Sequence, residues 1–345
     1  MQDKTFKEIL SILWEGKLTI ISVTMLFIAI GITYSFTAQK WWSSNAEVGA
    51  PSVTDMLPFM YIVKRYEPIF DSLDEDDKLK LGNDLEKFSD HELTFQRFIQ
   101  AFNSNLNKKT FLTQSDEFKV VKDEIGIKDI SDDEIDGWYT RINARSLDRA
   151  TNTRYSLSFQ FIDAKGSQDL LKNYINYIND IVSAELYTEL YSQLQTKKSE
   201  LAQRKLALEL QAKAKLALEI EKGKYALEIT STANLEHPFV GGNNYNELFP
   251  VTMGSAALAT YINVLQGIKN LSLFENRLSD INAKLSLAEK ETTLVNGDLQ
   301  VFHYLNEPQK PLSQALPKRF FIIVLCLNLG LVLGVLLVLI RKIVR

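Results

Sequence analysis

The stretch from Phe320 to Ile340 constrains the fold more than any other part of the sequence, because it contains no charged residue. At a rise of 1.5 Å per residue, about 21 helical residues cross the ~30 Å hydrocarbon core of a bilayer. The stretch is almost entirely apolar, and Asn328 is its single amide. It therefore predicts a transmembrane helix at 320–340, followed by a basic tail at 341–345.

A second uncharged run predicts another transmembrane helix at 18–38. The segment before it, 1–17, carries acidic as well as basic residues, and no small-residue cleavage pattern follows the run. Both features favour an uncleaved anchor over a secretory signal peptide. Trp14, Trp41 and Trp42 flank the run and are expected to anchor it at the two membrane interfaces.

Two spans leave both ends of the chain on the same side of the membrane. The Lys and Arg residues close to the spans are slightly more numerous on the terminal side, which favours a cytoplasmic location for both termini. They are Lys4, Lys7, Lys17, Arg341, Lys342 and Arg345 on the terminal side and Lys40, Lys310, Lys318 and Arg319 on the other. The large region between the spans would then lie in the periplasm of a Gram-negative cell.

Composition argues against several kinds of functional site. The single cysteine, Cys326, lies in a predicted span, so the chain forms no internal disulfide and no thiolate metal site. A net charge of −4 offers no basic surface for nucleic acid. His91, His237 and His303 are far apart, and the common phosphate-binding and catalytic motifs are absent. We therefore expect no enzymatic activity, no metal and no cofactor.

The region 39–166 is expected to form the first part of an α/β base domain. Apolar and polar residues alternate from Tyr155 to Phe161, which predicts a strand with one buried face. The segment from Arg141 to Leu147 is its expected partner. Because an isolated hairpin is only marginally stable, we expect further strands near Ala46 and from Leu299 to Tyr304.

Helical patterns accompany this predicted sheet. Apolar residues recur every three or four positions from Asp84 to Leu106, which indicates an amphipathic helix. The apolar segment from Met56 to Phe70 is expected to be broken by Pro58 and Pro68. The acidic stretch from Asp71 to Asp77 lacks the residue order of a calcium loop, and we interpret it as the solvated start of a helix.

Residues 167–297 are expected to form a long helix, a tip and returning helices. From Ser167 to about Ala233 the chain has no proline and one glycine, Gly223, among good helix formers. A continuous helix of about 66 residues would be about 100 Å long. Its expected partners are a returning helix from Ser255 to Thr293 and the same helix in neighbouring copies of the chain.

A short phrase recurs within the predicted long helix. LALEL begins at Leu206, LALEI at Leu216 and YALEI at Tyr225. The spacing of ten and then nine residues is not the period of a solenoid repeat. We interpret the phrase as a local composition that favours a helix.

Segment 298–319 is expected to return to the membrane as a strand and then an extended approach shaped by Pro308, Pro311 and Pro317. Within the last span, Gly330 and Gly334 have the spacing at which small residues allow transmembrane helices to pack closely. They are either ordinary lipid-facing positions or, together with Asn328, a contact with the first span or with another membrane protein.

The order of these segments resembles the Wzz family of polysaccharide co-polymerases, the inner-membrane chain-length determinants of O-antigen and enterobacterial common antigen. The resemblance rests on ILWEGK followed by KWWSSNAEV, on YALEITSTANLEHP, on LFPVTMGSAALATYINVL, on FHYLNEPQKPLSQALPKR, and on Gly330 with Gly334. Two departures stand out. The family's Ser-Pro-x-x-Pro reads SQALP here and keeps only Pro317, and its Ala-Gly-Ile reads Ala233-Asn234-Leu235.

The resemblance implies an α+β membrane protein, with two transmembrane helices flanking a periplasmic α/β base domain and a long extended helical hairpin. It further implies a homo-oligomeric ring, octamer-like in size, among membrane lipids. Such a ring acts with a Wzy-type polymerase on a glycan carried by undecaprenyl diphosphate and sets its modal length. The family has no catalytic residues of its own.

Two alternatives remain at the level of sequence, and a third, a two-span sensor, is nearly excluded. A co-polymerase coupled to a tyrosine kinase, for capsule or exopolysaccharide, would need the kinase on another chain. A periplasmic adaptor of an export system also carries long helical hairpins, but usually has one span and a lipoyl-like domain. A two-span sensor needs a cytoplasmic output domain, whereas five residues follow Ile340.

Overall fold

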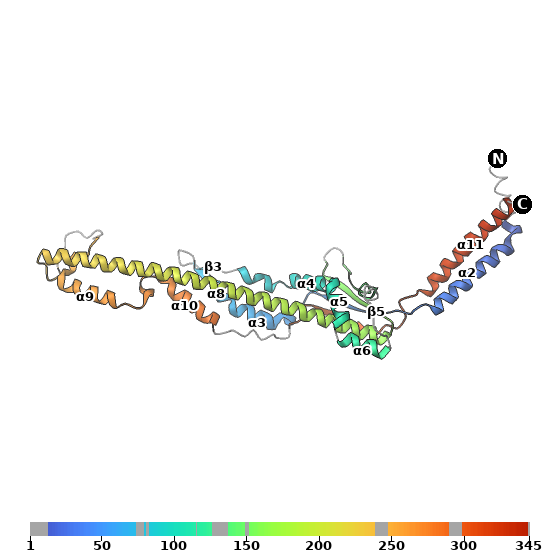
Figure 1. The fold of residues 1–345 in the computed structure, drawn as a ribbon, viewed down its shortest axis with the longest axis horizontal. Coiled ribbons are helices and arrows are strands. Elements are labelled where there is room, and N and C mark those ends of the chain that lie inside the picture. The colour runs from blue at the N-terminus through green and yellow to red at the C-terminus, as the bar shows by residue number, and fades with distance from the viewer. Residues whose placement is uncertain are drawn as a thin grey trace. The chain divides into compact units, whose positions relative to one another are not determined.

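The computed structural model describes residues 13–73, 79–80, 83–114, 116–125, 137–148, 152–238, 248–289 and 299–343 (Figure 1). The chain divides into two compact units. Unit 1 comprises Met1–Met56, Asp90–Ser183 and Gln300–Arg345, and unit 2 comprises Leu57–Ser89 and Ala184–Leu299. Each unit is therefore assembled from segments that are far apart in the sequence.

Unit 1 contains a four-stranded antiparallel sheet with the strand order β4-β5-β1-β6. The strands are β1 (Trp42–Gly49), β4 (Ile142–Ser146), β5 (Arg154–Phe161) and β6 (His303–Gln309). The predicted hairpin of β4 and β5 is confirmed, with Ala144 opposite Leu157. The strand expected at 299–304 begins later, at His303, because Val301 and Phe302 are buried in the core before the strand starts.

The core of unit 1 lies on one face of this sheet. Leu157, Phe159 and Phe161 are fully buried, as the period of two in β5 predicts. The helix α4 (His91–Asn103) contributes a row of buried phenylalanines: the ring of Phe95 meets that of Tyr155 in β5, and the ring of Phe98 stacks on that of Phe302 at 4.8 Å between centroids. Tyr174, also buried, donates its hydroxyl hydrogen to the carbonyl of Phe102 at 2.9 Å. The Tyr174 hydroxyl is therefore hydrogen-bonded, so its burial leaves no unsatisfied donor at this point of the core.

The amphipathic pattern expected from Asp84 to Leu106 is divided between two elements. A 3₁₀ helix, η1 (Asn83–Ser89), precedes α4, and the carboxylate of Asp90 accepts a hydrogen bond from the backbone N–H of Leu93 at 2.9 Å. This N-cap starts a new helix, because it satisfies a backbone donor that the first turn leaves free. The helices α5 (Asn105–Gln114) and α6 (Asp116–Ile125) follow.

The expectation that Pro58 and Pro68 break their segment is wrong, because both lie inside α3 (Val53–Phe70). Ser52 and Asp55 form a reciprocal cap at its start: the Asp55 carboxylate accepts from the Ser52 N–H at 2.7 Å, and the Asp55 N–H donates to the Ser52 hydroxyl at 3.3 Å. Buried apolar residues then recur at helical spacing, namely Met56, Phe59, Val63, Tyr66 and Phe70. Burial of this face outweighs the two backbone donors that the prolines remove. Most of the acidic stretch from Asp71 to Asp77 lies outside the described residues.

The predicted long helix is confirmed as α8 (Ala164–Thr232), a single helix of 69 residues that begins in unit 1 and continues into unit 2. In unit 2 the chain returns along it through η2 (Val251–Met253), α9 (Gly254–Gly267), η3 (Leu271–Leu273) and α10 (Arg277–Glu289). The segment from Ser255 to Thr293 is therefore divided into the separate helices α9 and α10, rather than forming one returning helix. After Gly267 the backbone becomes extended at Ile268, and the Asn270 side chain caps η3 by accepting from the Ser272 N–H at 3.1 Å.

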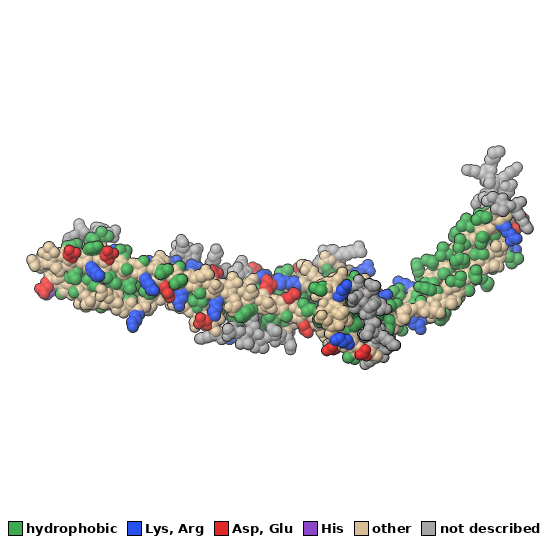
Figure 2. All heavy atoms as spheres, in the orientation of Figure 1, with side chains coloured by type: hydrophobic (Ala, Val, Ile, Leu, Met, Phe, Trp, Pro, Cys, Tyr) green, Lys and Arg blue, Asp and Glu red, His purple; other side chains and the backbone are tan. Residues whose placement is uncertain are grey.

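Two helices of unit 1 correspond to the predicted spans. They are α2 (Lys17–Thr37) and α11 (Arg319–Ile343), and both are long and apolar enough to cross a membrane by length and composition. They lie side by side in Figure 1, and hydrophobic side chains cover their visible surface in Figure 2. The segments expected at 18–38 and 320–340 fall almost entirely within them.

Candidate functional site

The two apolar helices pack against each other through glycines from both sides. A Cβ added to Gly330 would lie 2.8 Å from the Cα of Thr24, and one added to Gly334 would lie 3.0 Å from the Cα of Ile20. Real Cβ atoms essentially never lie as close to a backbone as at Gly330, and the contact at Gly334 would force α2 to move by a few tenths of an ångström. The close approach of α11 to α2 therefore depends on the absence of these side chains. The structure thus places both predicted glycines on the same face, toward the first span.

The sequence analysis missed the matching positions on α2. A Cβ at Gly31 would lie 2.8 Å from the Sγ of Cys326, and one at Gly16 would clash with the side chain of Val338. Ser35, four residues after Gly31, is 2% exposed, and its hydroxyl has no hydrogen-bond partner among the described residues. The Gly31-x3-Ser35 spacing is the signal that could have revealed this face.

Asn328 lies on a different side of α11 from the glycines. Two residues before Gly330 correspond to a rotation of about 200° around an α-helix. Its side-chain amide is exposed and donates to the carbonyl of Val324 at 2.8 Å. The structure therefore does not bring Asn328 together with Gly330 and Gly334. This amide is available to a partner other than α2.

The predicted aromatic anchors have different surroundings. Trp14 is largely exposed, with the ammonium of Lys17 5.1 Å from its ring centroid. The guanidinium carbon of Arg141 instead lies 3.5 Å from the ring centroid of Trp41. The backbone carbonyl of Trp41 accepts a hydrogen bond from the N–H of Ala315 at 2.7 Å. Trp42 is the first residue of β1. Trp41 thus ties the chain leaving α2 to the chain entering α11.

The three prolines of the membrane approach also separate in the structure. Pro308 lies inside β6, an edge strand, where a missing backbone donor is tolerated, and its carbonyl accepts from the side chain of Gln168 at 2.8 Å. Pro311 follows that strand. Pro317 precedes α11, and its carbonyl accepts from the Gln314 side chain at 3.2 Å. Pro311 and Pro317 therefore lie between the sheet and α11, whereas Pro308 belongs to the sheet itself.

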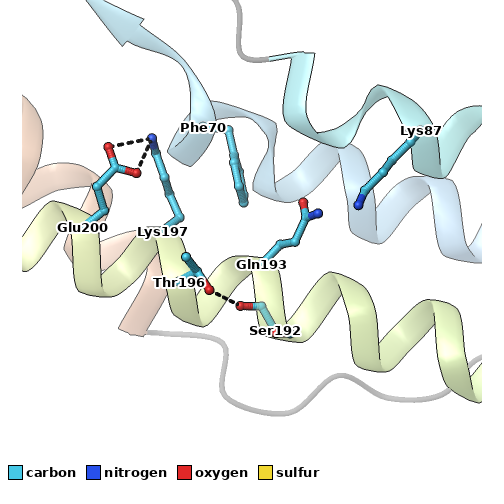
Figure 3. A pocket seen from close by; sticks show the side chains of 7 residues that line it. All are labelled: Phe70, Lys87, Ser192, Gln193, Thr196, Lys197 and Glu200. Atoms are coloured by element: carbon cyan, nitrogen blue, oxygen red, sulfur yellow. Dashed lines mark hydrogen bonds and ion pairs between the residues drawn. The ribbon is translucent and has the colours of Figure 1, made fainter.

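In unit 2 a hollow of about 510 Å³ opens beside α8 (Figure 3). It is lined by Phe70, Lys87, Ser192, Gln193, Thr196, Lys197 and Glu200. Lys197 pairs with Glu200 at 3.0 Å, and Lys87 pairs with Glu189 at 2.5 Å. The lining offers donors and acceptors to a polar ligand, but it contains no histidine, cysteine or base-activated hydroxyl arranged for catalysis.

One strongly perturbed carboxylate lies in unit 2, outside this hollow. The side chain of Glu275 is buried and receives hydrogen bonds from Arg277 at 2.5 Å and from Lys215 at 3.0 Å. The hydrogen bond from Arg277, helped by Lys215, lowers the pKa of Glu275 to about 2, although burial acts in the opposite direction. Both cations bind it directly, so the group stabilises the packing of α8 against the return segment. In the described part of the chain, no three His, Cys, Asp or Glu residues are grouped to hold a metal ion.

Comparisons with known proteins find one family model and several relatives to which the chain is similar. The model of the family described as Wzz, chain length determinant protein, matches residues 4–114. The ECA polysaccharide chain length modulation protein of Salmonella typhimurium is 23% identical over 329 residues, covering 93% of this chain and 90% of that protein. A protein of Escherichia coli K12 named ferric enterobactin transport protein FepE is 22% identical over 341 residues, covering 93% and 84%.

Solved structures show the same fold. A full-length bacterial polysaccharide co-polymerase is 21% identical and has a TM-score of 0.62 over 97% of both chains. A Wzz dodecamer determined by cryo-electron microscopy is 16% identical and has a TM-score of 0.51 over 79% of this chain. The resemblance and the fold class predicted from the sequence are therefore confirmed.

Proposed function

We propose that this chain, which is of Wzz type in both sequence and fold, regulates the length of a cell-surface polysaccharide. One observation carries the proposal. The order of span, sheet, long helix, returning strand and span matches a full-length polysaccharide co-polymerase over 97% of both chains. The relatives described as chain length determinants point to the same role.

The proposed role is regulatory rather than enzymatic. The chain would work as a homo-oligomer, for which the related dodecamer is a precedent. It would act with a Wzy-type polymerase on a glycan linked to undecaprenyl diphosphate. The spans α2 and α11 would hold it in the inner membrane, with both termini in the cytoplasm and the sheet and α8 in the periplasm.

Within this proposal, the residues of the two spans and of their flanking segments would have different roles. The side of α11 that carries Gly330 and Gly334 is covered by α2, so the role of these glycines would be to fix the distance between the two spans. The exposed Asn328 amide would face another transmembrane helix, because a polar side chain is costly in contact with lipid tails. The membrane interfaces would be the location of three aromatic anchors, Trp14, Trp41 and Trp42. The segment that leads from the sheet to α11 would be shaped by Pro308, Pro311 and Pro317.

Deletion of the gene tests the proposed function. We expect the glycan ladder on a gel to change from a cluster of lengths to a broad decay, because polymerisation continues without length control. Total polymer should remain, and expression of the full chain from a plasmid should restore the cluster. Loss of all polymer would contradict the proposal and would indicate a polymerase or a flippase instead.

A further inference from the structure

The far half of α8 carries large apolar side chains on its exposed side. Leu206 and Leu210 are each 60% exposed and Leu218 is 51% exposed, and exposed Tyr225 and Ile229 continue the series. We call these five residues the outer strip. Leu206, Leu210, Ala214 and Leu218 follow one another at i+4 spacing, which forms a continuous ridge on a helix. Exposed apolar surface in one contiguous strip indicates an interaction site.

The opposite side of the same helix segment is already covered. Leu208 and Ala212 are buried, and each lies about 200° around the helix from Leu206 and Leu210 respectively. Residues 206–229 are therefore apolar on both sides. The buried side is covered by the chain itself, whereas none of the described residues covers the outer strip, so its partner is expected outside the single chain. This explains the recurring LALEL and YALEI phrases, whose first and last residues include four members of the strip.

The return segment carries a second exposed apolar surface at the same level along α8. Val264 is 60% exposed and Leu273 is 69% exposed, and we call this pair the return strip. Lys215 donates to the carbonyl of Phe274 at 3.2 Å, and a Cβ at Gly223 would lie 3.1 Å from Ile262. Residues 262–274 therefore run alongside residues 215–223. Unit 2 thus exposes apolar side chains both on α8 and on the return segment that runs beside it.

We propose that the outer strip of one copy packs on the return strip of the next copy. A second copy is the proposed partner because it carries the return strip, an exposed apolar surface on which the outer strip can pack. Copies anchored by the same two spans are also parallel. The two strips differ, so each contact is heterologous, and heterologous contacts between parallel copies generate a ring when the rotation closes. This inference rests on the proposed homo-oligomer and assigns its contact in unit 2.

The charges near the two strips agree with this pairing. Glu221 and Glu228 are exposed within the outer strip, whereas Lys269, also exposed, is the only charged residue between Gly254 and Phe274. Lys213 and Lys224 lie toward one edge of the outer strip. Contact between the strips would bring a cation of one copy close to carboxylates of the next, which favours this register over a contact between two outer strips.

Paired cysteines test the contact in the full-length chain in its native membrane. Cys326 is first replaced by alanine, so that the introduced residues are the only thiols. We expect the double variant Leu218→Cys with Leu273→Cys to give dimers, trimers and higher products with a short bis-maleimide, because each copy then carries both halves of the contact. The two single variants, Leu218→Cys and Leu273→Cys, are the matched controls and should give no product beyond the monomer.

Two outcomes would overturn this proposal. Absence of products larger than a dimer from the double variant, while its mass in detergent remains oligomeric, would place the contact elsewhere. Dimers from the single Leu218→Cys variant would show that two outer strips meet each other. The glycan ladder of the double variant is recorded before cross-linking, so a failure of the contact is distinguished from a failure of the proposed function.

Discussion

At the end of α8, Asn234 occupies a position that usually requires glycine. Its φ is +56°, in the left-handed region. The N–H of Asn234 donates to the carbonyl of Ser231 at 3.2 Å, and the N–H of Leu235 donates to the carbonyl of Thr230 at 2.9 Å. This pair of bonds is a Schellman motif, which satisfies the last carbonyls of a helix. Asparagine is the best substitute for glycine there, so the departure from the family's Ala-Gly-Ile does not change the turn.

Substitutions at Asn234 test this interpretation at the scale of one residue. We expect Asn234→Val to lower the free energy of unfolding by about 1–2 kcal/mol, because a β-branched residue is strained at positive φ. Asn234→Gly should preserve stability. Thermal unfolding followed by circular dichroism measures both, with Glu228→Gly as a control that should lose about 1 kcal/mol within the helix. Equal stability of the valine and glycine variants would show that the turn is not under this constraint.

At the scale of elements, the pairing of α2 with α11 depends on positions without side chains. A Cβ at Gly31 would lie 3.0 Å from the Cβ of Cys326, the single native cysteine, which is slightly closer than the ~3.5–4.5 Å of a disulfide. A small separation of the two helices therefore brings Gly31→Cys into range, and mild oxidation should link it to Cys326 within one chain. Adding Gly334→Leu should reduce the yield, because the new side chain meets the backbone of Ile20. Leu331→Phe, at an exposed position of α11, is the matched control.

The yield is read as a mobility shift on a non-reducing gel, and the glycan ladder of each variant is recorded in parallel. If Gly334→Leu alters neither the disulfide nor the glycan length, the glycines have no role in holding the spans together. A disulfide-linked dimer in place of the shifted monomer would mean that α2 pairs with α11 of another copy.

A second contact between elements should make stability depend on pH. Glu275 joins α10 and η3 to Lys215 of α8, and its pKa is lowered from 4.5 to about 2 in the folded chain. A lowered carboxyl pKa stabilises the fold above pH 4.5, and this stabilisation is lost as the pH falls from 4.5 toward 2. We expect Glu275→Gln to lower the free energy of unfolding by about 1–2 kcal/mol at pH 7 and by much less near pH 2.5. Denaturant unfolding at the two pH values measures the difference, and an equal loss at both would contradict the assignment.

For the whole molecule, patterns that repeat along the chain predicted more than isolated residues did. Uncharged runs, alternation in β5 and the proline-free stretch correctly predicted the two apolar helices α2 and α11, the hairpin and α8. Pro58 and Pro68 did not end the helix as predicted, because burial of one face of α3 outweighed the local effect of the prolines. The break of the return segment at Ile268 depends on a side-chain cap at Asn270 that no periodicity reveals.

The candidate site, too, could be predicted only in part from the sequence. The spacing of Gly330 and Gly334 predicted a close approach of helices but could not identify which helix approaches, since Gly31 and Ser35 carry the matching information on another segment. Asn328 was grouped with the glycines because it is close in sequence, whereas it lies on a different side of α11. The outer strip of α8 was interpreted as composition alone, because exposure cannot be read from a helix whose partners are unknown.

The unbroken backbone of α8 has a mechanical consequence. A helix of 69 residues is about 100 Å long and has no proline at which to hinge. A tilt of only one degree at its first turn would therefore move its last turn by about 2 Å, simply because the lever is so long.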